Sequence, residues 1–182
     1  MKTLFFCLFL VLLTNCATLN EDECRTGDWY GQGLKNGREG RNLLSAHTKA
    51  CSEYGINPNI AEYTKGFGAG IKSYCTPENG YRVGVEGKTY QKVCPIRMEK
   101  AFLAKYRLGK KIYDNIQTLN TLNSELQNLE SKLASTTGEQ YNRDQIKNQI
   151  YSKRSEISRV KKKIIFLKAQ SGYDMEDIVD YF

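Results

Sequence analysis

Two stretches of the chain decide its fold: IYDNIQTLNTLNSELQNLESKL at residues 112–133 and IKNQIYSKRSEISRVKKKIIFL at residues 146–167. In both, apolar residues recur three, four or seven positions apart, which is the heptad pattern of helices that pack along a seam. The first seam consists of Ile112, Leu119, Leu122, Leu126, Leu129 and Leu133, and the second of Ile146, Ile150, Ile157, Val160, Ile164 and Leu167.

The two seams match each other as an antiparallel pair. Facing positions of antiparallel helices have residue numbers with a constant sum, and Leu133 with Ile146 gives 279, as do the other apolar pairs. Two layers are mixed: Leu126 opposite Lys153, and Asn115 opposite Ile164. Polar interruptions of this kind set the register at a cost in stability.

We therefore predict an antiparallel coiled-coil hairpin over residues 111–170. Its turn is expected at Ser135–Glu139, where Gly138 favours the end of a helix. Two readings of the hairpin stay open. It either satisfies its own apolar seam and has no partner, or it serves as a spacer or docking surface for another envelope protein.

The segment 24–110 is rich in glycine and aromatic residues. A tyrosine precedes a glycine by three positions at Tyr30–Gly33, Tyr63–Gly66, Tyr81–Gly84 and Tyr106–Gly109. Further glycines follow at Gly37, Gly70 and Gly87. On helices such small residues form a stripe that lets another backbone approach closely, so we predict a small domain of tightly packed helices here.

Helix-capping and helix-ending residues along this segment predict short helices and an all-α class. We expect helices at about 39–53 and 59–75, the second capped by Asn59, then a turn over Thr76–Gly80 and a new helix from Ile96 after Pro95. Strand-like alternation occurs only at residues 81–93, and two glycines weaken it. No Gly-Lys-Ser/Thr follows Gly31-Gln32-Gly33, which argues against a phosphate loop.

The N-terminus has the pattern of an export signal. Lys2 precedes the apolar run Leu4–Leu13, which is too short to cross a bilayer, so we predict a signal peptide at 1–15 that is removed. Leu13-Thr14-Asn15-Cys16 resembles the bacterial lipobox except at Asn15, which predicts lipidation of Cys16 and a tether at 16–23. By resemblance to sorted lipoproteins, Ala17 rather than Asp after the cysteine implies the outer membrane, facing the periplasm. The alternative is export as a soluble periplasmic protein.

Four cysteines remain after the leader and Cys16: Cys24, Cys51, Cys75 and Cys94. In an oxidising compartment they are expected to form two disulfides. Three pairings exist and spacing does not choose among them; Cys24 with Cys51 and Cys75 with Cys94 is preferred only because it closes the shortest loops. The alternative is a metal-binding or redox-responsive module in which His47, four residues before Cys51, joins Cys51, Cys75 and Cys94 as a zinc-type Cys3His set.

The segment 24–115 contains an ordered pattern of glycine, aromatic, cysteine and polar residues. The pattern consists of Asp28-Trp29-Tyr30, Gly33, Asn36-Gly37, Gly40, His47, Cys51, Tyr63, Gly66, Gly70, Tyr74-Cys75-Thr76-Pro77, Asn79-Gly80, Gly84, Tyr90, Val93-Cys94-Pro95, Phe102, Tyr106, Gly109 and Tyr113. It resembles that of an uncharacterised family of bacterial envelope lipoproteins, a domain of unknown function. The resemblance implies a helical, cysteine-containing, membrane-anchored protein and no particular activity. Asn36 departs from the pattern, which has an acidic residue before this glycine.

Charge and composition limit the classes of partner. The 182 residues hold 27 Lys and Arg against 20 Asp and Glu, with 40% hydrophobic residues, which suits one soluble domain with an extension and excludes collagen-like and multi-pass membrane proteins. For an exported chain, the surplus favours anionic lipid or wall polymer over nucleic acid, or is a solvated surface. The acidic tail at 171–182 either folds back on Lys161–Lys163 or acts as a recognition peptide.

Catalytic chemistry has few candidate residues. His47 is the only histidine, and Cys51 is the only thiol that the sequence places beside it. A cell-wall-modifying enzyme would need two of the carboxylates Asp28, Glu39, Glu53, Glu62, Glu78 and Glu86, and no spacing selects a pair. We therefore expect a protein that is not an enzyme and has no cofactor: an envelope lipoprotein with a structural or protein-interaction role, held to the membrane by its lipid.

Overall fold

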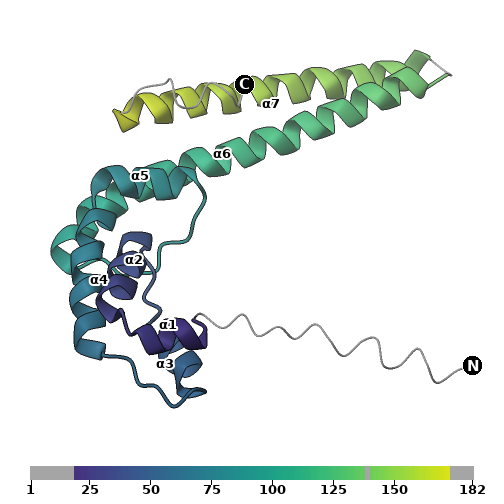
Figure 1. Ribbon diagram of the computed structural model, residues 1–182. Helices are drawn as coiled ribbons and strands as arrows, with labels where there is room; N and C mark the ends of the chain where they lie inside the picture. Colours follow the sequence, from purple (N-terminus) through teal and green to yellow (C-terminus); the bar gives the residue numbers. More distant parts are fainter. Residues whose placement is uncertain (1–18, 138–139, 173–182) are drawn as a thin grey trace, which may run out of the picture. The chain divides into compact units, whose positions relative to one another are not determined.

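The computed structural model describes residues 19–137 and 140–172, which form helices and no strands (Figure 1). This confirms the all-α class. The helices are α1 (Glu21–Thr26), α2 (Trp29–Glu39), α3 (Leu44–Ser52), α4 (Ile60–Tyr74), α5 (Pro77–Val85), α6 (Ile96–Ser135) and α7 (Gln140–Ser171). The chain divides into two compact units, the first ending at Ser73 and the second beginning at Tyr74. This boundary lies within the segment 24–110, and α6 runs without a break past residue 110.

Side-chain caps set the starts of the helices in the first unit. Asn20 and Glu23 form a reciprocal capping box at α1, and the Asp28 carboxylate accepts from the backbone N–H of Gly31 at the start of α2. Glycines in the left-handed conformation, Gly27 and Gly40, end these two helices. The prediction of one helix over 39–53 was wrong at its start, because the chain turns at Gly40 and α3 begins only at Leu44.

Helices α2 and α4 cross at their glycines. A Cβ added at Gly33 would lie less than 3.0 Å from the backbone of Tyr63, and one added at Gly66 would lie equally close to the backbone of Tyr30. The contact is therefore reciprocal, because each glycine lies against the carbonyl oxygen of the aromatic residue that precedes the other glycine. Gly37 and Gly70 make a second close contact of this kind. This confirms the predicted close packing.

The second unit repeats this arrangement with α5 and α6. A Cβ added at Gly84 would lie less than 3.0 Å from the carbonyl oxygen of Tyr106, and one at Gly109 less than 3.0 Å from that of Tyr81. Gly87 does not belong to the stripe, because it follows the helix in the left-handed conformation.

The turn predicted at residues 76–80 and the strand-like reading of 81–93 were both wrong. The Thr76 hydroxyl accepts from the backbone N–H of Asn79, and Pro77 occupies the first turn of α5. Pro needs no N–H partner at that position, so these residues begin a helix rather than a turn. The glycines that weakened the strand pattern lie at the contact with α6 or after the helix.

Helices α6 and α7 lie side by side as an antiparallel hairpin (Figure 1). The buried core of the hairpin comprises Ile112, Ile116, Leu119, Leu122, Ile157, Ile164 and Leu167, with Leu126 and Val160 packed against it. One predicted layer was wrong. Ile116 rather than Asn115 is buried opposite α7, because the Asn115 side chain turns back to donate to the Lys111 carbonyl of its own helix. The proposed helix stop at Gly138 lies outside the described residues.

Candidate functional sites

Three helices of the first unit bring a polar cluster into its interior. The Asn36 side chain from α2 lies between the imidazole of His47 on α3 and the hydroxyl of Tyr63 on α4. Its Nδ2 atom is 2.7 Å from His47 Nε2 and donates to the Tyr63 hydroxyl at 3.0 Å. That hydroxyl also accepts from the backbone N–H of Leu43 at 3.0 Å. All three side chains are buried, at 1–3% exposure.

This cluster holds His47 in its neutral form. Nδ2 of Asn36 carries only hydrogens, so His47 Nε2 accepts and the proton of the ring is on Nδ1. Burial lowers the pKa of His47 below its ordinary value of 6.5, the nearby Glu23 carboxylate raises it in part, and Lys35 lowers it further. The imidazole is therefore an internal hydrogen-bond acceptor at neutral pH.

Neither of the two sulfur-based candidate sites has a free thiolate. Cys51 forms a disulfide with Cys24, and Cys75 forms one with Cys94, each with a Cα–Cα distance of 5.6 Å. The favoured pairing is thus the one in the structure. A Cys51–His47 nucleophile and the Cys3His metal set both require reduced sulfur, so neither is present in this oxidised chain. Over residues 19–137 and 140–172, no cluster of metal-ligating side chains occurs.

Three of the carboxylates considered for wall hydrolysis have local structural partners. Asp28 caps α2, Glu39 pairs with Arg41, and Glu86 pairs with Lys88 and Arg82. The partners of Glu86 lower its pKa, with the hydrogen bond to Lys88 the largest contribution. A general acid needs the opposite shift, so Glu86 is set up as a stable anion rather than as a proton donor.

A partly buried tyrosine links two parts of the other unit through its hydroxyl. Tyr90 accepts from the backbone N–H of Cys94 at 2.9 Å and donates to the Glu99 carboxylate at 2.9 Å. Burial, with the Glu99 carboxylate adding to it, raises the pKa of Tyr90 to about 12. The phenol is therefore a neutral link that joins the Cys75–Cys94 loop to the first turns of α6.

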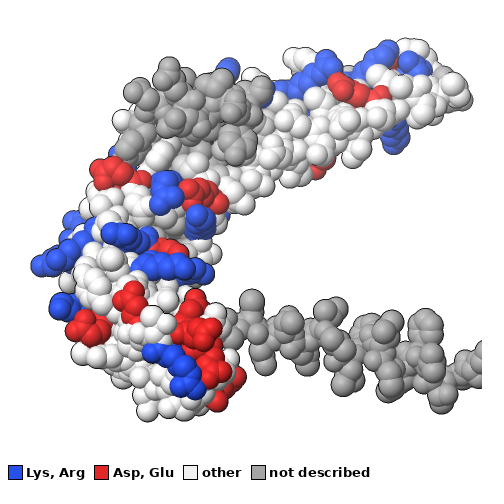
Figure 2. Space-filling model, in the orientation of Figure 1, with Lys and Arg blue, Asp and Glu red and all other residues white. Residues whose placement is uncertain are grey.

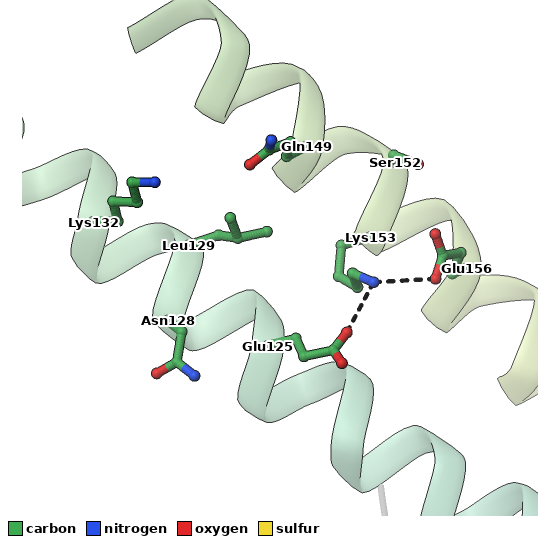
Figure 3. Close-up of a pocket in the computed structure, with 8 residues that line it drawn as sticks. All are labelled: Glu125, Asn128, Leu129, Lys132, Gln149, Ser152, Lys153 and Glu156. Atoms are coloured by element: carbon green, nitrogen blue, oxygen red, sulfur yellow. Dashed lines mark hydrogen bonds and ion pairs between the residues drawn. The ribbon is translucent and has the colours of Figure 1, made fainter. Parts of the chain in front are cut away.

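The hairpin carries a groove of about 480 Å³ at its polar layer. Figure 3 shows Lys153 of α7 between Glu125 of α6 and Glu156 of α7, at 2.8 Å and 3.3 Å. Leu129 lies beside these charges. Hydrogen bonds to the two carboxylates raise the pKa of Lys153, with Glu125 the larger contribution. The antiparallel pairing had placed Lys153 opposite Leu126. In the structure its ammonium group also pairs with two carboxylates.

Sequence reasoning missed two members of these sites. Asn36 was noted only as a departure from the family pattern, yet it is the residue that contacts both His47 and Tyr63. Its position between Gly33 and Gly37 on the close-packed face of α2 was the available signal. Tyr90 lay in the segment 81–93, whose alternation resembled a strand, and nothing local indicated that its hydroxyl would bond to Cys94 and Glu99.

The described part of the chain contains no helix long and apolar enough to cross a membrane. No curated protein and no solved structure matches the chain. Residues 28–111, which hold both glycine crossings, the His47 cluster and the Cys75–Cys94 disulfide, match the family described as Protein of unknown function (DUF2799).

Proposed function

We propose that this protein is an exported lipoprotein of the bacterial envelope that acts as a structural or protein-interaction module rather than as an enzyme. The observation that carries the proposal is the pair of disulfides, one in each unit. Disulfides of this kind persist in oxidising compartments and are rare in the cytosol. They are what the apolar leader and Cys16, which lie outside the described residues, lead us to expect.

The disulfides also account for the cysteines in a way that suits lipidation. Four of the six cysteines are paired with each other, and Cys7 lies in the leader. Cys16 is the one remaining thiol, and it stands at the position where a lipobox places the acylated residue. Each methylene of an acyl chain that enters the bilayer contributes about 0.8 kcal/mol to membrane binding, so several chains on one cysteine hold a protein there stably.

The hairpin supports an interaction role through its surface rather than through an open seam. Its apolar residues face one another, and Figure 2 shows acidic and basic side chains interspersed over the hairpin toward its turn. A second groove of about 600 Å³, lined by Leu133, Ile150 and Tyr151 together with Arg143, Lys147 and Arg154, lies near that turn. A protein partner of mixed apolar and charged character fits these two grooves.

Acylation is tested with an alkyne-labelled fatty acid in a bacterial host. We expect label on the wild-type chain, no label on Cys16→Ala, and wild-type labelling of Cys7→Ala, which is the matched control within the leader. Labelled protein should sediment with outer membranes and contain no free thiol without reductant. A chain of full length, unlabelled and reduced in the cytosol would contradict the proposal.

The interaction role is tested with photo-crosslinking residues in the anchored protein. Gln149 lines the groove beside Lys153, whereas Ser158 is exposed on the same helix and lines neither groove. A crosslinker at Gln149 should capture a defined envelope protein that the one at Ser158 does not. A crosslinker at Tyr151 tests the second groove in the same way. Capture at Ser158 equal to that at Gln149, or no capture at Gln149 or Tyr151, would show that the grooves are not docking sites.

A further inference from the structure

Positively charged residues gather at the base of the hairpin, the end away from its turn, which comprises residues 107–122 and 157–172. Residues 157–172 of α7 and its end contain Arg159, Lys161, Lys162, Lys163 and Lys168 and no acidic residue. The facing stretch of α6, residues 107–122, adds Arg107, Lys110 and Lys111 and a single acid, Asp114, which pairs with Lys110. The excess of seven positive charges in these two stretches equals the formal net charge of the whole chain, +7.

One face of α7 combines this charge with exposed apolar surface. Arg159, Lys162, Lys163 and Phe166 are spaced i, i+3, i+4 and i+7, so they lie on one side of the helix. The Phe166 side chain is 65% exposed, and the adjacent Ile165 is 49% exposed. An exposed phenyl ring on the same helix face as three cations is a suitable surface for a ligand that is both acidic and apolar.

The chain itself contains a segment of that chemistry immediately after α7. Residues 173–182, which lie outside the described part, read YDMEDIVDYF. They hold four acidic residues, no Lys or Arg, and six apolar or aromatic residues. Gly172, just before them, has φ 74, the left-handed conformation that ends a helix and turns the chain away from its axis.

Distance favours contact within one chain. Phe166 lies six residues before Gly172, which is about 9 Å along a helix at 1.5 Å per residue. Ten residues span up to about 33 Å when extended, so the segment reaches every residue of this face. A short tether of this kind produces an effective concentration in the millimolar range. Opposite charge at such a concentration favours the tail over a partner from solution.

We propose that residues 174–182 dock on the face formed by Arg159, Lys162, Lys163 and Phe166 and cover the exposed Phe166 and Ile165. This proposal is independent of the proposed function, because it concerns contacts within one chain and does not require export or lipidation.

The test places a photo-crosslinking benzoylphenylalanine at position 166 of the purified full-length chain. Tyr151 is the matched control, since it is aromatic, 79% exposed and on the same helix. Mixing isotope-labelled and unlabelled copies distinguishes crosslinks within a chain from those between chains. We expect position 166 to crosslink to peptides from 173–182 of its own chain, at least tenfold more than position 151 does.

Charge variants complete the experiment. Lys162→Glu with Lys163→Glu should lower the intrachain crosslink at least fivefold, and adding Asp177→Lys and Asp180→Lys should restore most of it. Lys162 and Lys163 are exposed, so the variants should remain helical, which circular dichroism checks. Equal crosslinking at 166 and 151 would show that the tail makes no specific contact and would overturn the proposal. Crosslinks only between chains would assign the face to a second copy. Crosslinks only to added phosphatidylglycerol vesicles would assign it to a lipid surface.

Discussion

The Nδ2 atom of Asn36 lies 2.7 Å from Nε2 of His47 in the interior of the first unit. Because an amide nitrogen only donates, this contact requires a neutral imidazole that accepts. Protonation of His47 would place two donors against each other in a buried site. The stability of the first unit is therefore linked to the protonation state of the only histidine in the chain.

We predict that stability falls as the pH drops below about 6.5, the ordinary pKa of histidine. Burial lowers the pKa of His47 in the folded state, so the unfolded chain binds more protons and the free energy of unfolding decreases as the pH falls from 6.5 through the folded pKa. Urea unfolding at pH 7.5, 6.5 and 5.5 measures this dependence. His47→Gln retains an acceptor without titrating, and an undiminished pH slope in that variant would assign the effect to other groups.

Asn36→Asp is expected to reverse the sign of the pKa shift at His47. A carboxylate next to the imidazole favours the imidazolium and raises the pKa of His47 relative to the wild type. NMR titration of the single imidazole reports the value directly. Asn42→Asp is the control, because Asn42 is an exposed asparagine of the same unit. A similar shift in both variants would mean that the effect is a general one of charge.

Alanine at the glycine crossing of the first unit is predicted to be destabilising. Gly33→Ala and Gly66→Ala each force α2 and α4 apart, because the new Cβ meets backbone and not a movable side chain. Overpacking of this kind costs about 1–3 kcal/mol. Gly68, also in α4, is the control, because a Cβ added there has no atom within 4 Å. Gly68→Ala should therefore stabilise the protein by up to about 1 kcal/mol. Thermal unfolding ranks the three variants, and equal melting temperatures would refute the close approach of the helices.

Each disulfide is expected to contribute about 3 kcal/mol, since the two bridges close loops with sequence separations of 27 and 19. Replacing Cys24 and Cys51 with serine should destabilise the first unit, and replacing Cys75 and Cys94 should destabilise the second. Peptide mapping without reductant should recover only these two linkages. Fragments that join Cys51 to Cys75 would show a different pairing.

The polar layer of the hairpin makes a prediction about charge reversal. Lys153→Glu places three carboxylates together and should lower the melting temperature of the second unit. Adding Glu125→Lys should recover part of the loss, because it restores an opposite charge across the two helices. Lys147→Glu, at an exposed position of the same helix, should have a smaller effect. Absence of rescue in the double variant would indicate that the Lys153–Glu125 pair does not form in solution.

The hairpin was largely readable from the sequence because its information is local and periodic. Heptad spacing placed the seams, and the antiparallel pairing predicted most of the buried layers. It failed at Asn115, where the polar residue was placed on the seam although Ile116, one position later, is the buried one. An apolar residue next to a seam position shares its spacing closely enough that periodicity alone does not separate the two.

The glycine–aromatic segment was readable only in part. The repeated spacing of Tyr30–Gly33 and its relatives correctly indicated helices in close contact. It did not indicate that the fragments pair reciprocally, Tyr30–Gly33 with Tyr63–Gly66 and Tyr81–Gly84 with Tyr106–Gly109. That choice of partner depends on how the loops and disulfides bring distant helices together, which no local pattern reports.

The amino-acid order alone thus determined the helical class and most layers of the hairpin, since both follow from spacing along the chain, whereas it left three pairings of the cysteines open. Tertiary structure decided that Asn36, His47 and Tyr63 form one buried cluster and that Tyr90 links Cys94 to Glu99. The physical reason is that hydrogen bonds between side chains 11 or 27 residues apart exist only after helices have packed. Until then water satisfies the same groups, and nothing in their spacing distinguishes them from exposed polar residues.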